Sequence, residues 1–159
     1  MDAPIRKLPP LARVDDLELG KAAEHLVVAD LILQGYRAYL SDQGLSYDAV
    51  IDLDGRLIRL QIKTTRQPRP VPQRSKQVQA YLFHTRRAGK AGRRRYDETH
   101  FDLLALVALD IRVIAYMPFI KTVPGSIILR TVGAQPNKNA SRLQNIDGFP
   151  IDKAIEALR

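Results

Sequence analysis

The stretch SYDAVIDLDGRLIRLQIKTT, residues 46–65, decides the fold. It holds two runs in which apolar and polar residues alternate, separated by Asp54 and Gly55. Asp-Gly is a favoured sequence for a type I′ turn, in which both central residues take positive φ, and such a turn joins two antiparallel strands. The stretch therefore predicts a β-hairpin with Asp54 and Gly55 at its tip.

The turn also predicts which side chains share a face of the hairpin. If Leu53 pairs with Arg56, the register carried back along both strands places Asp48 opposite Gln61, and residues opposite each other on antiparallel strands share a face. One face then carries Asp48, Val50, Asp52, Leu57, Arg59, Gln61 and Lys63, and the other carries Tyr47, Ala49, Ile51, Leu53, Ile58, Leu60 and Ile62. The second face is apolar and predicts a core surface. The first gathers its polar groups at the end far from the turn.

Asp48, Gln61 and Lys63 form a candidate site for phosphodiester hydrolysis. A carboxylate and an amide oxygen suit a hard cation such as Mg²⁺, which polarises a phosphodiester and lowers the pKa of an attacking water. A nearby lysine ammonium can orient that water and stabilise charge in the transition state. The alternative that spacing leaves open is a solvent-exposed hairpin face, on which Asp52 and Arg59 form a surface ion pair.

A helix is expected before the hairpin. Asp15 and Asp16 are both suitable N-caps, and Gly35 suits the position just after the helix. We expect its core face to be the stripe Leu19, Ala22, Leu26, Ala29 and Leu33. Glu24 lies off this stripe, among Gly20 and valines, and is the candidate for a second carboxylate at the metal site. The alternative for Glu24 is a solvent-exposed position, which is the commoner outcome for a helical glutamate.

The rest of the chain predicts further strands and a closing helix. Strands are expected at residues 37–40, 78–85, 103–109, 112–117 and 126–130, and a short helix at 151–158. The run 103–109 has no polar face, which predicts a strand buried inside the sheet. Residues 66–77 and 86–95 are expected to be loops, and residues 1–13 a proline-containing arm. A length of 159 residues suits a single domain.

The formal net charge of +8 comes from one segment. Residues 66–95 contain no acidic residue and ten basic ones: Arg66, Arg69, Arg74, Lys76, Arg86, Arg87, Lys90, Arg93, Arg94 and Arg95. This basic segment is expected to bind DNA through its phosphates, and the alternative is a solvated loop without a ligand. Its prolines and glycines disfavour an amphipathic membrane-binding helix. Three nearby aromatic residues could stack on bases, although burial in the core is the favoured interpretation: Tyr81, Phe83 and Tyr96.

Several classes of protein are disfavoured by what the sequence lacks. There is no cysteine, so disulfides and thiolate zinc sites are excluded. The longest strongly apolar run, residues 103–109, is too short to span a bilayer, and the first residues lack the apolar core of a signal peptide. No P-loop or GxSxG motif is present, and the three histidines lack metal-binding spacing. We therefore expect a cytoplasmic protein with no membrane partner.

The order of Glu24, Asp48 and the triplet Gln61-Ile62-Lys63 resembles the motif of the PD-(D/E)XK nuclease superfamily. It is similar in particular to the group I intron-associated endonucleases, in which Gln stands where most relatives have Asp or Glu. The similar stretches are GKAAEHLVVADLILQGY (20–36), YDAVIDLDGRLIRLQIKTT (47–65) and, more loosely, THFDLLALVALDIRVIAYMPF (99–119). Two departures matter: Tyr47 replaces the motif's proline, and Gln61 removes one negative ligand, which should weaken metal binding or shift it to Glu24 and Asp48.

The resemblance implies an α/β (α+β) fold with a restriction-endonuclease-like core, in which a mixed central sheet carries an antiparallel meander packed on the N-terminal helix. It implies hydrolysis of double-stranded DNA with Mg²⁺, or Mn²⁺ in its place, held by Glu24, Asp48 and Gln61 while Lys63 assists. Because one site cuts one strand, a homo-oligomer, dimer or tetramer, is expected. The biological role stays open between homing, repair, restriction and junction resolution. The alternatives are a DNA-binding module without catalysis and an RNA-processing nuclease.

Overall fold

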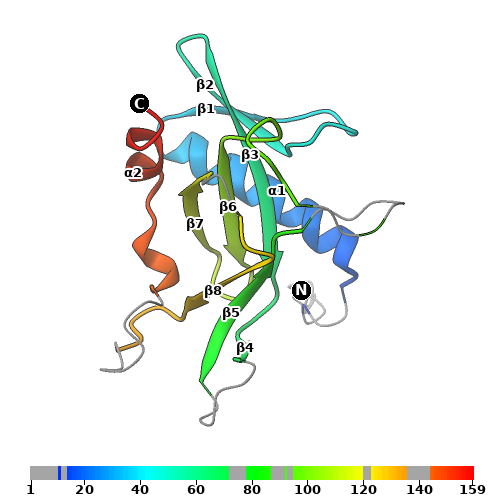
Figure 1. Ribbon diagram of the computed structural model, residues 1–159, viewed down its shortest axis with the longest axis vertical. Helices are drawn as coiled ribbons and strands as arrows, with labels where there is room; N and C mark the ends of the chain where they lie inside the picture. The colour runs from blue at the N-terminus through cyan, green and yellow to red at the C-terminus, as the bar shows by residue number, and fades with distance from the viewer. Residues whose placement is uncertain are drawn as a thin grey trace, which may run out of the picture.

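The computed structural model describes residues 11, 14–71, 78–86, 92, 95–119, 123–135 and 144–159. Figure 1 shows the arrangement of its elements. They are, in chain order, α1 (Asp16–Leu33), β1 (Arg37–Leu40), β2 (Ala49–Leu53), β3 (Arg56–Thr65), β4 (Arg69–Pro70), β5 (Gln79–His84), β6 (Leu103–Ala108), β7 (Val113–Pro118), β8 (Ser126–Arg130), a 3₁₀ turn (Ile146–Gly148) and α2 (Ile151–Glu156).

Two sheets organise these strands. The larger has the order β1-β2-β3-β6-β7, and the smaller has the order β4-β5-β8. In the larger sheet β3 and β6 run parallel, while every other neighbouring pair is antiparallel. The chain reaches β6 from β3 by way of β4 and β5, which belong to the other sheet. The predicted mixed sheet with an antiparallel β1-β2-β3 meander is therefore confirmed.

The β2–β3 hairpin has the predicted turn and register. Asp54 and Gly55 both take positive φ, 51° and 94°, as a type I′ turn requires. The backbone N–H of Gly55 donates to Asp52 Oδ1 at 2.8 Å, which closes the tip. Leu53 pairs with Arg56, and the register continues back to the pair Ala49 and Leu60. The local turn chemistry therefore fixed the pairing of the whole hairpin.

Helix α1 begins and ends where its caps predict, but it buries a different face. Asp15 accepts the N–H of Glu18 at 2.9 Å, and Gly35 follows the helix with φ of 91°. The buried residues are Leu19, Ala23, Val27 and Leu31. Of the predicted stripe only Leu19 is buried, and Leu33 is 87% exposed. Because the helix carries apolar residues on nearly every side, its sequence permitted more than one core face, and packing selected between them.

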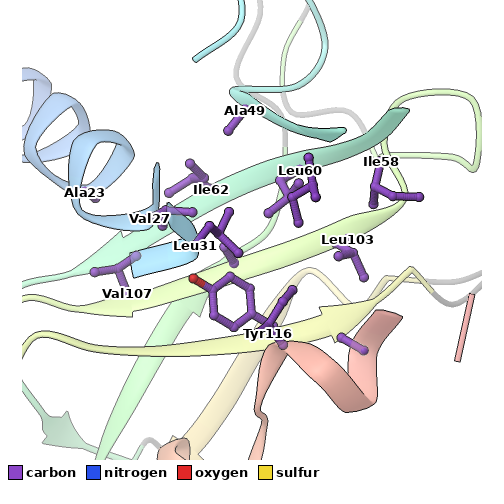
Figure 2. Packing of buried hydrophobic residues seen from close by; sticks show 14 of the residues in the cluster. Ala23, Val27, Leu31, Ala49, Ile58, Leu60, Ile62, Leu103, Val107 and Tyr116 are labelled. Carbon is purple, nitrogen blue, oxygen red and sulfur yellow. The ribbon is translucent and has the colours of Figure 1, made fainter. Parts of the chain in front are cut away.

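The selected face of α1 packs on the larger sheet. Figure 2 shows Ala23, Val27 and Leu31 of α1 in one cluster with side chains of β3, β6 and β7. This cluster also contains Ile51 and Ile58, which confirms the predicted core face of the hairpin from Ala49 onward. Helix α2 adds Ile151, Ala154 and Ile155 to the same cluster. Tyr47 was predicted on that face but packs against the other cluster, because strand alternation begins only at Ala49.

The opposite face of the larger sheet packs on the smaller sheet. Leu104, Leu106 and Ala108 of β6 form a second cluster there with aromatic side chains. Strand β6 is thus buried on both faces, as its uninterrupted apolar sequence predicted. The aromatic residues Tyr81, Phe83 and Tyr96 belong to this cluster and are at most 7% exposed. They are core residues, and their rings do not form a surface on which bases stack.

The basic segment contains more regular structure than predicted. Residues 66–77 were expected to be a loop, yet β4 (Arg69–Pro70) pairs with β5. A two-residue strand shows no periodicity, and proline is tolerated there because β4 is an edge strand. The predicted loop residues 72–77, 87–91 and 93–94, and most of the predicted arm 1–13, lie outside the described residues. In the described part of the chain, no helix is long and apolar enough to cross a membrane.

Candidate active site

The candidate site lies where β3 continues past the end of β2. Strand β2 begins at Ala49, so Asp48 comes just before it, whereas β3 runs on to Thr65. The backbone N–H of Asp48 donates to the carbonyl of Leu60 at 2.8 Å, which extends the ladder by one bond. The next N–H along β3, that of Ile62, donates instead to Asp48 Oδ2 at 2.7 Å. The Asp48 carboxylate thus supplies the acceptor that a longer β2 would have offered to this N–H. The bond fixes the carboxylate at the point where β2 begins.

Gln61 meets Asp48 as the hairpin register predicted. Its side-chain Nε2 donates to Asp48 Oδ2, the same oxygen that accepts from Ile62. The amide is buried, with 7% of Gln61 exposed. Asp48 Oδ1 accepts no hydrogen bond from the described residues. One oxygen of the carboxylate is therefore fixed by the hairpin, and the other is available to a ligand.

Lys63 brings a positive charge to the same carboxylate. Burial raises the pKa of Asp48 above its usual value, against the Ile62 N–H, the Lys63 charge and the Gln61 amide, which all lower it. The Lys63 ammonium donates to the hydroxyl of Tyr96 at 3.2 Å and lies 5.3 Å from the centre of that ring. The charged end of Lys63 is therefore held by a side chain that no sequence pattern placed in the site.

Glu24 lies close enough to Asp48 to sense its charge. It sits on α1 next to the buried Ala23, at the border of the face that packs on the sheet. Burial raises the pKa of the Glu24 carboxyl, and the negative charge of Asp48 raises it further, against the smaller lowering effects of His25 and Lys21. Like-charge repulsion of this kind acts over short distances in a partly buried site. The structure therefore joins Asp48 and Gln61 directly, and Glu24 on α1 lies within range of the Asp48 charge.

Arg59 is absent from this site because it holds the neighbouring loop. Its guanidinium pairs with Asp102 through Nε–Oδ2 and Nη2–Oδ1, both at 3.0 Å, and Nη1 donates to the carbonyl of Thr99 at 2.6 Å. The surface pair with Asp52, considered from the sequence, does not form, since Asp52 caps the turn instead. The backbones of Arg59 and Asp102 are also joined, because Asp102 N–H donates to Arg59 O at 2.8 Å. Arg59 thus ties the segment before β6 to β3.

The family model of the PD-(D/E)XK endonucleases matches residues 14–152. The chain belongs to the PD-(D/E)XK endonuclease family. Its fold is similar to that of a solved structure, the bacterial homing endonuclease I-Ssp6803I, with a TM-score of 0.64 and 18% sequence identity over 91% of this chain and 95% of that one. Comparison with curated proteins gives no match. Family membership makes this chain a nuclease, and the likeness to I-Ssp6803I is one of fold.

The side chains at the site of this PD-(D/E)XK endonuclease suit a divalent cation. Glu24, Asp48 and Gln61 supply two carboxylates and an amide, and such oxygen donors are preferred by hard cations. A cation would also relieve the repulsion between Glu24 and Asp48 that burial strengthens. Among the described residues, no three His, Cys, Asp or Glu side chains gather as a metal site. A third protein ligand at this position would therefore be the amide of Gln61.

The basic residues of this endonuclease fall into three groups. Arg69, Arg86 and Arg95 are exposed, as a phosphate-binding role requires. Arg66 is engaged within the protein, because its Nη2 pairs with Asp16 at 2.6 Å and its Nη1 donates to the carbonyl of Leu11. The other six lie outside the described residues: Arg74, Lys76, Arg87, Lys90, Arg93 and Arg94. Within the described chain, Arg66 is thus a link between the end of β3 and the start of α1.

Proposed function

We propose that this nuclease is a Mg²⁺-dependent endonuclease that cuts double-stranded DNA at specific sites. One observation carries the proposal: Asp48 accepts a hydrogen bond from the Gln61 amide, the charge of Lys63 acts on Asp48, and the charge of Asp48 acts on Glu24 of the first helix. These two carboxylates, the amide and the lysine come from α1 and the hairpin, and Asp48 uses only Oδ2 in its bonds to Ile62 and Gln61. They match what hydrolysis of a phosphodiester needs, namely a cation site with a positive charge beside it.

Glu24, Asp48 and Gln61 would hold the Mg²⁺, with Mn²⁺ as a substitute. When bound, the cation polarises the phosphodiester and lowers the pKa of a bound water. Asp48 contributes through Oδ1, since Oδ2 is fixed by the backbone of β3 and by Gln61. Gln61 would contribute its amide oxygen, whereas its Nε2 donates to Asp48 Oδ2. The absence of a third carboxylate predicts weaker cation binding than a site with an acidic residue at position 61 would show.

Lys63 would orient the attacking water and stabilise the negative charge that develops on the phosphate. An ammonium has three donors, and the Tyr96 hydroxyl takes one of them. The remaining donors are available to the water and to a phosphate oxygen. The protein partner of Lys63 at 3.2 Å is the neutral hydroxyl of Tyr96.

The exposed arginines Arg69, Arg86 and Arg95 would track the DNA backbone, together with the basic residues of the same segment outside the described chain. One site of this kind cuts one strand, so cutting both strands requires at least two copies. A homo-oligomer, as a dimer or tetramer, would place two sites on opposite strands with matched geometry. A homing role is the form of site-specific cutting that the fold likeness to I-Ssp6803I favours.

The proposal is tested by cleavage of a supercoiled plasmid library with random inserts, in Mg²⁺ and in EDTA. We expect nicked or linear product only with the metal, and recurrent cut sites when the product ends are sequenced. Lys63→Ala should abolish cutting, whereas Lys153→Ala, which removes an exposed lysine from α2, should leave the rate unchanged. A parallel RNA library separates a ribonuclease from a DNA endonuclease.

A second candidate function is a DNA-binding module without catalysis. The observation that favours it is Gln61, a neutral side chain at a position where a third carboxylate would strengthen metal binding. Specific binding of DNA from the same library, with no cleavage in Mg²⁺ or Mn²⁺, would establish this module and overturn the proposed endonuclease. Cleavage abolished by Lys63→Ala while DNA binding is retained would establish the enzyme.

A further inference from the structure

Tyr96 touches the site from a distant part of the chain. Its hydroxyl accepts a hydrogen bond from Lys63 Nζ at 3.2 Å, and its ring lies 5.3 Å from that nitrogen. Only 7% of Tyr96 is exposed, so the ring is part of the core while its hydroxyl reaches the ammonium. A lysine side chain is flexible and otherwise samples many rotamers. Two interactions with one ammonium therefore fix a group that would be mobile without them.

Tyr96 is itself held in place on several sides. Its ring packs edge-on against Phe101 and His100, with centroid distances of 5.0 and 5.6 Å. The segment that follows Tyr96 is tied to β3 by the bidentate pair of Arg59 and Asp102. Because Tyr96 cannot follow the lysine, the hydrogen bond restricts Lys63 and not the tyrosine.

The same segment is also anchored to the residues just before β2, which include Asp48. The hydroxyl of Ser46, two residues before Asp48 in the chain, donates to the carbonyl of His100 at 2.9 Å. Asp48, Lys63 and Tyr96 are thus held by one connected set of interactions through β3, Ser46 and the loop before β6. A catalytic group gains most from support that is fixed before the substrate binds.

We propose that Tyr96 is a positioning residue for Lys63, which holds the ammonium in the orientation used for phosphodiester hydrolysis. The inference rests on the proposed function for its catalytic consequence, although the restraint on Lys63 stands independently of it. Tyrosine suits this role because a neutral hydroxyl accepts a hydrogen bond without cancelling the positive charge. A carboxylate in its place would pair with Lys63 and weaken the charge offered to the phosphate.

The test uses Tyr96→Phe, which removes the hydroxyl and keeps the ring. At saturating DNA and Mg²⁺, we expect the single-turnover cleavage rate to fall about tenfold, as expected when one hydrogen bond that orients a reacting group is removed. The Kd for DNA, measured in Ca²⁺, should stay within about twofold, because the buried Tyr96 hydroxyl does not contact DNA in this proposal. Tyr81→Phe is the matched control, since it removes a hydroxyl from a similarly buried tyrosine that bonds Asp110.

A second measurement does not depend on cleavage. The order parameter of the Lys63 ε-methylene, measured by NMR, should be high in the native protein and fall in Tyr96→Phe toward that of the exposed Lys153. Rates are measured well below the melting temperature of each variant, so that reduced stability does not enter them.

The outcomes separate the two proposals. A native protein that cuts no DNA overturns the endonuclease, while the order parameter of Lys63 still decides whether Tyr96 restrains it. A native protein that cuts DNA, with Tyr96→Phe as fast as Tyr81→Phe, overturns the positioning role. An unchanged order parameter for Lys63, or an effect confined to DNA affinity, also overturns it.

Discussion

Asp48 accepts the backbone N–H of Ile62 at 2.7 Å, at the point where β3 continues without β2 beside it. This bond makes the carboxylate part of the sheet and aims it at the face where Gln61 and Lys63 meet. Without Asp48, the N–H of Ile62 would need water or another strand as its acceptor, because β2 does not extend that far. The site is therefore built into the way the hairpin ends.

Asp48→Asn should keep the fold and lose the activity. Asparagine can still accept the N–H of Ile62 through its amide oxygen, but it carries no charge for a cation. We expect the cleavage rate at fixed Mg²⁺ to fall at least about 100-fold, the order of loss seen when one preorganised electrostatic group is removed. Asp52→Asn is the matched control, because Asp52 only caps the hairpin turn. Equal rates for Asp48→Asn and the native protein would remove Asp48 from the site.

Gln61→Glu should make the protein depend on the cation for its stability. Without metal, a second buried carboxylate beside Asp48 should lower the free energy of unfolding by ~1–3 kcal/mol, as for an uncompensated buried polar group. Mg²⁺ should restore this loss, because a third carboxylate strengthens the site and ligand binding stabilises the native state. The measurement is thermal unfolding across a Mg²⁺ titration. A Tm that responds to Mg²⁺ no more than that of the native protein would show that residue 61 is not a ligand.

Glu24→Gln tests whether the helix contributes to the cation site. The change removes the charge that repels Asp48, so the metal-free protein should unfold at the same temperature as the native protein or above it. The rise in Tm on adding Mg²⁺ should shrink, and the Mg²⁺ concentration for half-maximal cleavage should increase about tenfold or more, the range for losing one supporting group at a metal site. Glu18→Gln removes an exposed carboxylate of the same helix, which pairs with Lys21, and should change neither quantity. A normal Mg²⁺ response in Glu24→Gln would leave Glu24 outside the site.

The Arg59–Asp102 pair predicts a pH dependence of stability. Burial alone would raise the pKa of Asp102, but the hydrogen bonds and charge of Arg59 outweigh it and hold the pKa below its usual value of 3.8. A carboxyl with a lowered pKa stabilises the fold above its unfolded pKa, and this contribution is lost as the pH falls through the folded value. Asp102→Asn should therefore cost about 1.5–3 kcal/mol at pH 7, the range for a charge-assisted hydrogen bond.

The difference in the free energy of unfolding between Asp102→Asn and the native protein should become smaller as the pH falls below about 4. In this range Asp102 of the unfolded native chain is protonated. Urea unfolding at pH 7 and at the lowest pH where the protein stays folded measures this difference. Asp42→Asn, at an exposed position, is the control. A constant difference at both pH values would mean that the Asp102 charge adds nothing to the fold. Asp102→Asn should also slow cleavage, because the segment that holds Tyr96 loses its tie to β3.

The exposed arginines should set the salt dependence of DNA binding. Replacing Arg69, Arg86 and Arg95 together by Gln should reduce the slope of log K against log salt by about 0.9 for each phosphate that no longer has an arginine bound to it. Arg66→Gln should instead lower stability with little change in slope, because its guanidinium is paired with Asp16 and Leu11. The measurement is DNA affinity over a salt series. A slope that changes with Arg66 and not with the other three would reverse these assignments.

Much of the fold was predictable because its signals are local. The Asp54-Gly55 turn fixed the register of the hairpin, and that register alone brought Gln61 to Asp48. The uninterrupted apolar run of β6 predicted a strand covered on both faces. The caps at Asp15 and Gly35 predicted the bounds of α1. In each case a few neighbouring residues were enough to predict the feature, because turn geometry, capping and side-chain alternation act within one element or one turn.

The core face of α1 was not predictable in the same way. Apolar residues lie on nearly every side of this helix, and only docking on β3 and β6 selected Leu19, Ala23, Val27 and Leu31 as the buried set. That choice also decided the place of Glu24, since it put the residue at the border of the packed face. The sequence named Glu24 as a candidate, and packing placed it where the charge of Asp48 acts on it.

The sequence by itself determined the hairpin, its register and the meeting of Asp48 with Gln61, because a type I′ turn and a period of two leave a strand pair no other alignment. The tertiary structure alone decided what surrounds that pair. Tyr96 reaches Lys63, and Asp102 reaches Arg59, across long stretches of intervening chain. No pattern in sequence marks such contacts, since they depend on the parallel pairing of β3 with β6 and on the loop that this pairing sets beside the site.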